Sequence, residues 1–393
     1  MSVPFIPTKN ATAGVTTAPT TANLTTAGQM AINAYTGAMY MRKEDSTISD
    51  IVGDRLSGFR NRIINGNMAI DQRNAGASIS TASGTSGYSL DRWFYENSQT
   101  SKFTMQQNAG AISAPVGFKN YLGCTSLSAY SVLSGDYFHI GQRIEGYNVT
   151  DLGWGASGAS PVTLSFWVRS SLTGTFGGAV RNALGTRSYP FVFSISSANT
   201  WEQKTITIPG DTSGTWATDN SAGLQITFGL GTGSTYSGTA GSWASSNYIS
   251  ATGATSVVGT NAATFYITGV QLEKGLIATP FEVRSYGTEL ALCQRYCLAL
   301  APNSFQGIGT LRTGGASIYG VIPLPVPLRA APTAPSNANT FYCGDSNTTG
   351  SIVISGISSN SIYVTSTLLT SIGSVGNCVL FDGVLQTVYS SEL

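Results

Sequence analysis

The chain has 393 residues, of which 41 % are hydrophobic and 10 % are charged, and its formal net charge is +1. The hydrophobic fraction is that of a globular protein, so the composition excludes a disordered chain, and the length allows two or three domains. The balanced charge excludes binding to nucleic acid through its phosphates, because that requires a clustered excess of Lys and Arg.

The low charge content indicates how the surface is built. A typical protein has about 25 % charged residues, so Gly, Ser, Thr and Ala must cover much of this surface, which suits β-sheets and subunit interfaces. No apolar run approaches the roughly 20 residues that span a bilayer. Residues 1–9 also lack the basic start and apolar core of a signal peptide. We therefore expect assembly in a cytoplasm and no membrane insertion.

Ligands for a metal or a cofactor are scarce. The chain has one histidine, His139, and its five cysteines form no CxxC pair. Zinc sites use closely spaced Cys and His, so we expect no metal and no cofactor. Cys293 and Cys297 are four residues apart and could share a helix face. The preferred interpretation of the cysteines is nevertheless that of small, buried apolar side chains.

Short alternating segments, broken by Gly, Ser, Asn and Thr, predict an all-β protein. In the expected N-terminal anchoring segment, residues 1–58, the first 25 residues are expected to be extended. Strands are predicted over residues 29–33, 38–42 and 47–52. Such a meander buries too little to be stable alone, so it needs sister chains or a host surface. The residues expected to make these anchoring and oligomer contacts are Met30, Ile32, Tyr35, Met39, Tyr40 and Met41.

The central region, residues 59–285, has the clearest strand pattern. Residues 162–169 and 224–230 alternate between apolar and wetter positions, as antiparallel strands with one buried face do. Near Gly269 the alternation shifts by one residue, which a glycine-marked bulge explains. Strands of this kind over such a length predict a two-sheet β-sandwich, in its simplest form a jelly roll with long loops.

A connector helix is predicted over residues 286–302. Thr288 can cap it, Glu289 suits the positive end of the helix dipole, and Pro302 ends it. The helix would pack against a sheet.

The last region, residues 303–393, is expected to form a small β-sandwich at the tip of the molecule. Strands are predicted within residues 351–355, 361–365 and 379–388. The pair Asp382-Gly383, with apolar residues on both sides, predicts a tight hairpin.

Five stretches resemble sequences of phage tail proteins. AGQMAINAYTGAMYMRKEDSTISDIVG, residues 27–53, resembles a module near the N-terminus of many tail fibres and tailspikes. RNRIINGNMAIDQRNAG, residues 60–76, and YSLDRWFY, residues 88–95, resemble the opening of a β-sandwich domain common in phage tail proteins. FYITGVQLEKGLIATPFEVRSYGTELALCQRYC, residues 265–297, resembles the end of that domain. VPLRAAPTAP, residues 326–335, resembles the entry to a C-terminal β-domain found after it.

This resemblance implies a homotrimeric fibre that is attached to the virion through its N-terminus and exposes its distal β-domains. It also implies that the sandwich is similar to a jelly-roll carbohydrate-binding module. The implied partners are other virion proteins of the tail, baseplate or capsid and a host-surface glycan, and the implied location is the virion. Residues 110–260 resemble these proteins only in the spacing of their predicted strands, which is that of a sandwich. The ligand specificity would lie there.

Exposed aromatic rings are the natural candidates for contact with a glycan, because a ring stacks on the apolar face of a sugar. Trp167 lies on the polar side of its predicted strand, while Tyr236, Trp243 and Tyr248 lie in a long Gly- and Ser-rich loop, where Trp243 and Tyr248 have little else to pack against. These four are the predicted glycan-binding residues. The alternative for each ring is that it fills a core or a trimer interface.

Enzymatic hydrolysis of a polysaccharide would require two carboxylates that face each other. The sandwich acids Asp91, Glu96, Asp136, Glu145 and Asp151 form no recognisable motif. His139 has no nucleophile signature such as GxSxG nearby, so no catalytic residue is expected. The sequence therefore predicts a fibre that recognises a host surface. The first alternative is a purely architectural connector or decoration protein of the virion, and a polysaccharide depolymerase is a distant second.

Overall fold

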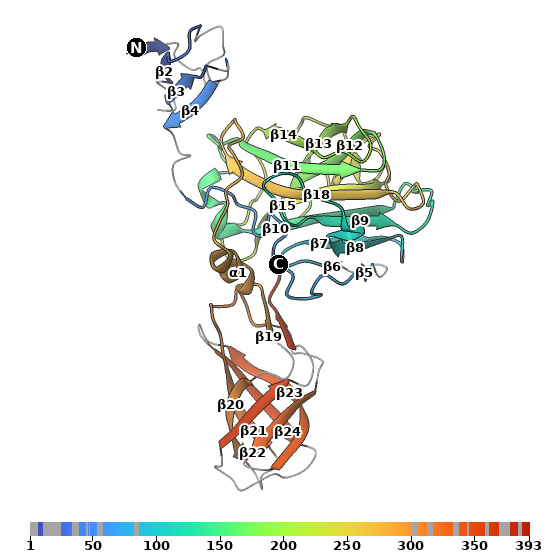
Figure 1. The fold of residues 1–393 in the computed structure, drawn as a ribbon, viewed down its shortest axis with the longest axis vertical. Coiled ribbons are helices and arrows are strands. Elements are labelled where there is room, and N and C mark those ends of the chain that lie inside the picture. The colour runs from blue at the N-terminus through green and yellow to red at the C-terminus, as the bar shows by residue number, and fades with distance from the viewer. Residues whose placement is uncertain are drawn as a thin grey trace.

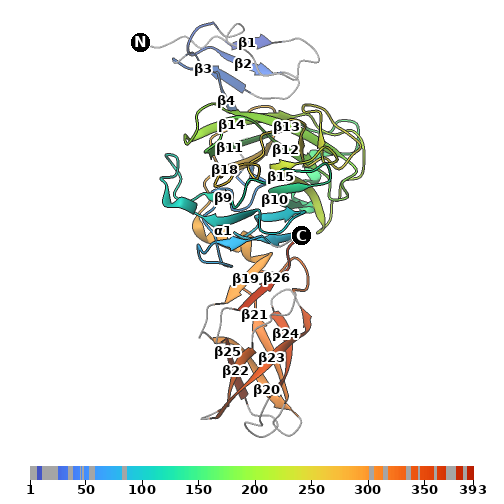
Figure 2. The same cartoon turned by 90° about the vertical axis from the view of Figure 1, so that its right-hand side faces the viewer.

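The structure is a computed structural model, and it describes residues 7–10, 25–33, 39–44, 46, 48–52, 58–81, 86–300, 305–312, 317–332, 338–343, 346–357, 361–368, 378–383 and 387–393. Over these residues the chain is nearly all-β, as predicted, with one α-helix and three short 3-10 helices. The main sheets form an N-terminal four-stranded sheet, a sandwich of two six-stranded sheets and a closed barrel. Figures 1 and 2 show these units following one another along the longest axis of the molecule.

The N-terminal sheet has the order β1-β2-β3-β4. Its strands are β1 (Pro7–Asn10), β2 (Met30–Asn33), β3 (Met39–Arg42) and β4 (Ile48–Val52). β1 pairs with β2 in parallel, and β2, β3 and β4 form the antiparallel meander that the sequence predicts.

The residues predicted to anchor the chain lie in this sheet. Met30 is opposite Met41, and Ala31 is opposite Tyr40. Tyr40 is buried, whereas Met30 and Met41 are half-buried. Tyr35, and the side chains of Ile32 and Met39, lie outside the described residues.

The central unit is the predicted jelly-roll sandwich. Its first sheet has the order β13-β12-β15-β10-β7-β6, and its second has the order β14-β11-β18-β9-β8-β5. The first sheet consists of β6 (Ser86–Tyr88), β7 (Phe94–Asn97), β10 (Tyr137–Glu145), β12 (Gly174–Arg181), β13 (Ser188–Ile195) and β15 (Ala222–Thr232). The second consists of β5 (Ile79–Ser80), β8 (Phe103–Gln107), β9 (Leu122–Ser126), β11 (Val162–Ser170), β14 (Glu202–Ile208) and β18 (Thr264–Lys274).

The connections of the sandwich contain the remaining short elements. These are η2 (Ala109–Ala111), η3 (Gly146–Asn148), η4 (Thr150–Leu152) and the parallel pair β16 (Ser237–Gly238) and β17 (Ser250–Ala251). β17 is packed against β12, β13 and β15. The long Gly- and Ser-rich loop therefore folds back onto the first sheet.

The core between the two sheets follows the predicted alternation. The fully buried apolar residues of β11 and β15 are Val162, Leu164, Phe166, Val168, Leu224, Ile226, Phe228 and Leu230. The rings of Phe166 and Phe228 meet edge to face, with their centroids 5.1 Å apart, and so join the two sheets. Burying a side chain of this size contributes roughly 1.5–3 kcal/mol, so this core is the main source of the stability of the sandwich.

The predicted bulge at Gly269 is present in β18. Trp167 is opposite Thr268, but Ser165 is opposite Gln271, so two residues of β18 face the single residue Phe166. Gly269 has a φ of 61°, which glycine adopts without the strain that a Cβ atom would cause. The bulge keeps the apolar residues on both sides of it in the core.

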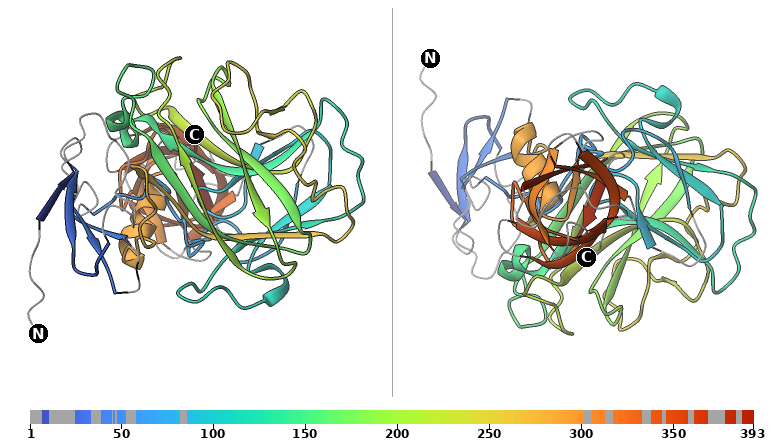
Figure 3. Two further views of the ribbon diagram at one scale, coloured as in Figure 1. Left: turned by 90° about the horizontal axis from the view of Figure 1, so that it is seen from above. Right: turned by 90° about the horizontal axis from the view of Figure 1, so that it is seen from below.

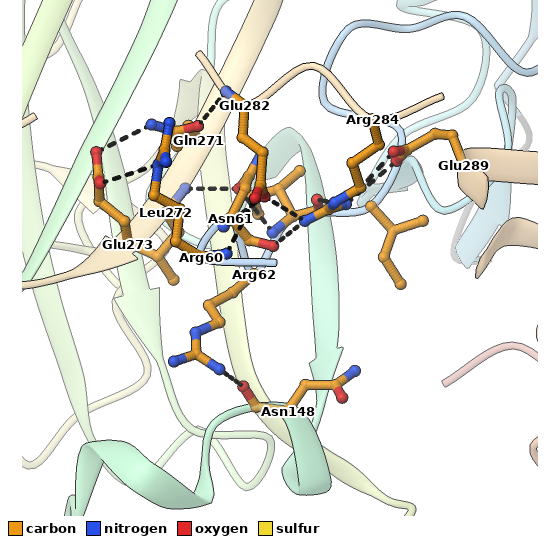
Figure 4. A network of polar contacts seen from close by, with 12 residues as sticks. Arg60, Asn61, Arg62, Asn148, Gln271, Leu272, Glu273, Glu282, Arg284 and Glu289 are labelled. Atoms are coloured by element: carbon orange, nitrogen blue, oxygen red, sulfur yellow. Dashed lines mark hydrogen bonds and ion pairs between the residues drawn. The ribbon is translucent and has the colours of Figure 1, made fainter. Parts of the chain in front are cut away.

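A buried polar network joins the segment that enters the sandwich to the segment that leaves it (Figure 4). The side-chain oxygen of Asn61 accepts from the N–H of Leu272 at 3.1 Å, and its amide nitrogen donates to the carbonyl of Val270 at 3.2 Å. Arg284 forms ion pairs with Glu282 and Glu289 in the same network. The opening and closing stretches of the domain thus lie side by side and satisfy each other's buried polar groups.

The connector helix α1 (Tyr286–Gln294) is shorter than predicted. The N-cap is Ser285, whose hydroxyl accepts from the N–H of Thr288 at 3.4 Å, so the prediction that Thr288 caps the helix is wrong. Beyond the helix the chain forms β19 (Cys297–Leu300), which pairs with β26 (Thr387–Ser390). The helix cannot continue to residue 302, because a strand from the far end of the chain takes those backbone groups.

The C-terminal unit is a closed barrel with the order β20-β21-β24-β23-β22-β25, and Figure 3 shows it end-on as a ring. Its strands are β20 (Phe305–Arg312), β21 (Ser317–Pro323), β22 (Ala338–Cys343), β23 (Ser346–Ile357), β24 (Ser361–Leu368) and β25 (Cys378–Gly383). The strands predicted within residues 351–355 and 361–365 are confirmed. The six strands form a closed barrel and not the predicted small sandwich of two stacked sheets. Closure leaves the barrel without an exposed sheet edge.

The hairpin predicted at Asp382-Gly383 is wrong. Both residues belong to β25 and lie opposite Thr340 and Asn339 of β22. After the barrel, β26 returns to β19, and residue 393 lies beside the sandwich (Figure 1). The chain therefore crosses the junction between sandwich and barrel twice.

Candidate functional site

A cavity of about 270 Å³, called the pocket below, lies over the outer face of the first sheet. The neighbouring strands β12, β15, β10 and β7 supply its floor, and residues 183–185 and 236–249 supply its wall. It is lined by Glu96, Tyr137, Arg143, Arg181, Ala183, Leu184, Gly185, Gln225, Tyr236, Asn247 and Ile249. Its volume lies near the lower end of the range for small-molecule pockets, so it suits a compact ligand.

The register of the strands brings polar side chains together on this face. Gln225 of β15 lies opposite both Arg143 of β10 and Arg181 of β12. Glu96 of β7 lies opposite His139 of β10. Directly opposite residues of an antiparallel pair point to the same face with their Cβ atoms about 5 Å apart. Four adjacent strands therefore build one polar cluster outside the apolar core.

Glu96 is the centre of this cluster. Its carboxylate contacts Nη2 of Arg143, and lies 3.1 Å from Nε2 of His139 and 3.6 Å from Nη2 of Arg181. Burial alone would raise the pKa of Glu96, but His139 and the two arginines outweigh that effect and lower the pKa to about 2. Burial lowers the pKa of His139 even though Glu96 opposes the shift. At neutral pH the carboxylate is therefore charged and the imidazole is neutral.

Several polar groups of the pocket have no partner within the described part of the chain. Gln225 is only 3 % exposed, and its side chain makes no hydrogen bond there. Nε of Arg181 is buried and likewise has no acceptor. The rings of Tyr137 and Tyr236 meet edge to face, with their centroids 5.1 Å apart, and no described group is hydrogen-bonded to either hydroxyl. A ligand in the pocket would thus meet free donors beside two aromatic rings.

The low pKa of Glu96 predicts how stability depends on pH. Because the folded-state pKa of about 2 lies below the usual 4.5, the stabilisation is complete above about pH 4.5 and is lost as the pH falls toward 2. The shift corresponds to at most about 3 kcal/mol, because the contribution of charged His139 is absent at neutral pH, where the imidazole is uncharged. We expect Glu96→Gln to lower the free energy of unfolding by more at pH 7 than at pH 3, as measured by urea denaturation at both values. An equal loss at both values would show that the cluster does not hold the carboxylate in its charged form.

Two of the four predicted glycan-binding residues lie at or beside the pocket. Tyr236 lines it. Tyr248 lies between Asn247 and Ile249, which also line it, but the ring of Tyr248 covers Gly238, where a Cβ atom would be only 2.2 Å from it. Tyr248 therefore supports the wall of the pocket.

Trp243 lies in a separate aromatic cluster with Trp154, Trp216 and Tyr189. The ring centroids of these three lie 5.3, 5.7 and 5.3 Å from that of Trp243. The indole N–H of Trp243 donates to the carbonyl of Pro209 at 2.9 Å. The premise that Trp243 has little to pack against is therefore wrong, because residues from three distant segments surround it.

Trp167 lies on β11 of the second sheet, on the other side of the sandwich from the pocket. It is half-buried beside Gly269. The structure thus does not bring the four predicted rings into one site, although glycan contact by each ring separately stays a prediction.

Sequence reasoning missed the residues that form the polar cluster. Arg143 and His139 alternate with Phe138, Ile140 and Ile144, which belong to the core. A basic side chain in the middle of a strand that otherwise alternates regularly indicates that polar groups cover the outer face of that strand. The pairing of that strand with residues 94–97 and 222–232 could not be read from local patterns.

Features of other site classes are few in the described residues. No group of three or more His, Cys, Asp or Glu side chains gathers there as a metal site would require. Cys124, Cys293 and Cys297 are free and buried, and burial raises the pKa of each thiol, so they behave as apolar side chains. Cys297 belongs to β19, so it shares no helix face with Cys293.

Among the described residues, no helix is long and apolar enough to cross a membrane.

Comparison with known proteins gives no relative in sequence. No family model matches the chain, and no curated protein matches it.

Solved structures give weak similarities. The enzymatically active domain of tailspike protein 4 of bacteriophage CBA120 is 13 % identical with a TM-score of 0.31, over 57 % of this chain and 23 % of that one. TmCBM61 in complex with β-1,4-galactotriose is 11 % identical with a TM-score of 0.29, and the match covers 55 % of this chain and 99 % of that one. A family 11 carbohydrate-binding module from Clostridium thermocellum, bound to a mixed-linked tetrasaccharide, is 13 % identical with a TM-score of 0.26. That match covers 51 % of this chain and 98 % of the other. This chain thus spans about a quarter of the matched tailspike chain. With all three TM-scores below 0.5, these similarities do not indicate what the chain binds.

Proposed function

We propose that this protein binds a glycan in the pocket on the first sheet. The observation that carries the proposal is the combination found there: a cavity of about 270 Å³ with two tyrosine rings, the amides of Gln225 and Asn247, and charged groups fixed by ion pairs. Sugars present hydroxyl groups around a partly apolar ring, so their recognition needs both kinds of group at close range. Four rigid strands hold these groups in place before the ligand arrives, which lowers the entropic cost of binding.

The role we propose is binding without catalysis. Hydrolysis of a glycosidic bond uses two carboxylates, one of which is protonated and acts as the acid. Among the residues that line the pocket, Glu96 alone has a carboxylate. Its pKa of about 2 keeps it ionised, and so unsuited to donate a proton.

We further propose that the chain is a virion fibre protein of a bacteriophage, acting as a homotrimer at the host surface. The support is the sequence resemblance together with the arrangement of the units in a line (Figure 2). An anchor at one end and a barrel at the other would hold the pocket away from the particle. Weak binding at one site would then be multiplied over three copies and many fibres.

A second candidate is an architectural role, in which the outer surfaces contact other virion proteins. It is favoured by a row of exposed apolar side chains across three neighbouring strands of the barrel. Val321 lies opposite both Ile308 and Tyr363, and all three are exposed.

An array of purified bacterial surface polysaccharides tests the proposed function. We expect the intact chain to be retained, and Gln225→Leu and Tyr236→Ala each to weaken retention by about tenfold or more, since each removes ligand contacts worth on the order of 1 kcal/mol or more. Tyr147→Ala is the matched control, because Tyr147 is 63 % exposed and is not among the residues that line the pocket. Trp167→Ala tests the separate site predicted on the second sheet.

Full retention of both pocket variants would show that the pocket is not the binding site. If the intact chain is retained by no polysaccharide but binds isolated virion proteins, the architectural role replaces the proposed one. The mass of the chain in solution tests the trimer, and a stable monomer would contradict it.

A further inference from the structure

The charges of the pocket do not balance. Arg143 and Arg181 carry two positive charges, whereas Glu96 carries the one negative charge among the residues that line the pocket. His139 adds no charge, because burial lowers its pKa. The side chains that line the pocket therefore carry a surplus of one positive charge.

The surplus lies on Arg181. Arg143 donates to Glu96, to the hydroxyl of Tyr88 at 3.2 Å and to a main-chain oxygen of Leu393 at 3.0 Å, so its guanidinium is well satisfied. Arg181 donates to the side chain of Asn247 and reaches Glu96 only at 3.6 Å. With Nε unpaired and only 7 % of the residue exposed, Arg181 is a buried cation with incomplete compensation.

Arg187 is an arginine whose positive charge is fully compensated by a carboxylate. Nε and Nη2 of Arg187 both donate to Asp211, each at 2.7 Å, in the two-pronged geometry that guanidinium and carboxylate prefer. Arg181 has no such partner within the described residues. Leaving a buried charge partly unpaired is costly, so a ligand that supplied the missing carboxylate would gain that energy.

The position of Gln225 adds a second donor beside this cation. Gln225 is directly opposite Arg181 on the neighbouring strand, and its amide has no partner among the described residues. A carboxylate between the two side chains could accept from the guanidinium and from the amide at once. The rings of Tyr137 and Tyr236, which line the same pocket, would then flank the body of the ligand.

We propose that the ligand of the pocket is an acidic glycan, one whose sugar carries a carboxylate that binds between Arg181 and Gln225. This inference rests on the proposed function and narrows it from glycans in general to uronic acids and related sugar acids. Arg181 provides the charge, Gln225 provides orientation, and Glu96 excludes a second carboxylate from the adjacent position.

Three acidic polymers and their neutral counterparts test the inference. The probes are polygalacturonate, alginate and polysialic acid, each compared with the same polymer after chemical reduction of its carboxyl groups to alcohols. We expect the full chain to bind at least one acidic polymer about 10- to 100-fold more tightly than its reduced form, and to lose that preference as the salt concentration rises. Arg181→Gln should abolish the preference, because it should weaken the binding of the acidic polymer far more than the binding of the reduced polymer. Arg187→Gln is a matched control, because it removes an arginine outside the residues that line the pocket.

The outcomes separate the inference from the proposed function. If reduced and acidic polymers bind equally well, or if Arg181→Gln weakens both to the same extent, the glycan site stands but its acidic specificity is overturned. If no polymer binds and the array of surface polysaccharides retains nothing either, both are overturned. Circular dichroism of Arg181→Gln shows whether the variant is folded, and Gln225→Leu should reduce the same preference if Arg181→Gln does not fold.

Discussion

Replacing Arg284 with leucine should lower the free energy of unfolding by about 3–5 kcal/mol. Arg284 donates to the carbonyl of Ile63 at 3.1 Å and to that of Asn61. It also lies 3.2 Å from Glu282 and 3.4 Å from Glu289. Leucine would leave both carboxylates buried without this cation and would remove the bonds of Arg284 to the opening segment of the sandwich (Figure 4). Urea denaturation, followed by tryptophan fluorescence, measures the loss.

Arg62→Leu is the matched control for this prediction. Arg62 belongs to the same entering segment, and its ion pair with Asp151 has a length of 2.8 Å. That pair is open to solvent, with side chains 21 % and 47 % exposed, so its loss should cost at most about 1 kcal/mol. Equal losses for the two variants would show that the network around Arg284 is no more important than a surface pair.

Replacing Arg92 with methionine should destabilise the junction between sandwich and barrel by a similar amount, about 3–5 kcal/mol. Arg92 is fully buried, donates to Glu392 and to the carbonyl of Arg143, and lies 3.6 Å above the ring of Tyr296. Glu392 follows the strand that returns from the barrel. Among the described residues, its carboxylate would keep only Arg73, at 3.1 Å. Differential scanning calorimetry would record the lower melting temperature.

A double variant tests the cause of that loss. If the unpaired charge of Glu392 is responsible, Arg92→Met combined with Glu392→Met should recover most of the stability, because an apolar pair can replace a buried ion pair at little cost. If the double variant is less stable than Arg92→Met alone, the loss comes from packing against Tyr296 and not from charge.

The sandwich could be predicted from the sequence because its signals are local. Residues 162–169 and 224–230 alternate with period two over a whole strand, and the structure buries every aliphatic or phenylalanine side chain on the face predicted to be apolar. The shift of phase at Gly269 was visible for the same reason, since a bulge changes the pattern within a few residues. Local alternation specifies which residues face the core wherever a strand has one buried side.

The C-terminal unit and the end of the helix depended on partners far along the chain. β19 exists as a strand because β26, about 90 residues later, pairs with it. The sequence near Cys297 contains no signal that predicts this pairing. Likewise Asp382-Gly383 has the composition of a hairpin, but β22 and β20 pair with that segment and hold it extended. Tertiary pairing overrides a turn propensity of a few tenths of a kcal/mol to about 1 kcal/mol.

The site was the least predictable part. The sequence favoured aromatic rings in a loop, whereas the pocket is formed mainly by polar residues of four strands that meet only through sheet order. Tyr236 was found because it is aromatic; Arg181 and Gln225 were missed because strand register alone brings them together. A search for basic residues in the middle of strands, on the side away from the core, would have found Arg143.

The most direct test of the account is a crystal structure of the full chain with an oligosaccharide released from a polysaccharide that it retains. We expect electron density for the sugar over β12, β15 and β10, with polar contacts to Arg181 and Gln225 and with the ring of Tyr236 beside it. Density on the second sheet near Trp167, or on the outside of the barrel, with the pocket filled by water alone, would contradict the account.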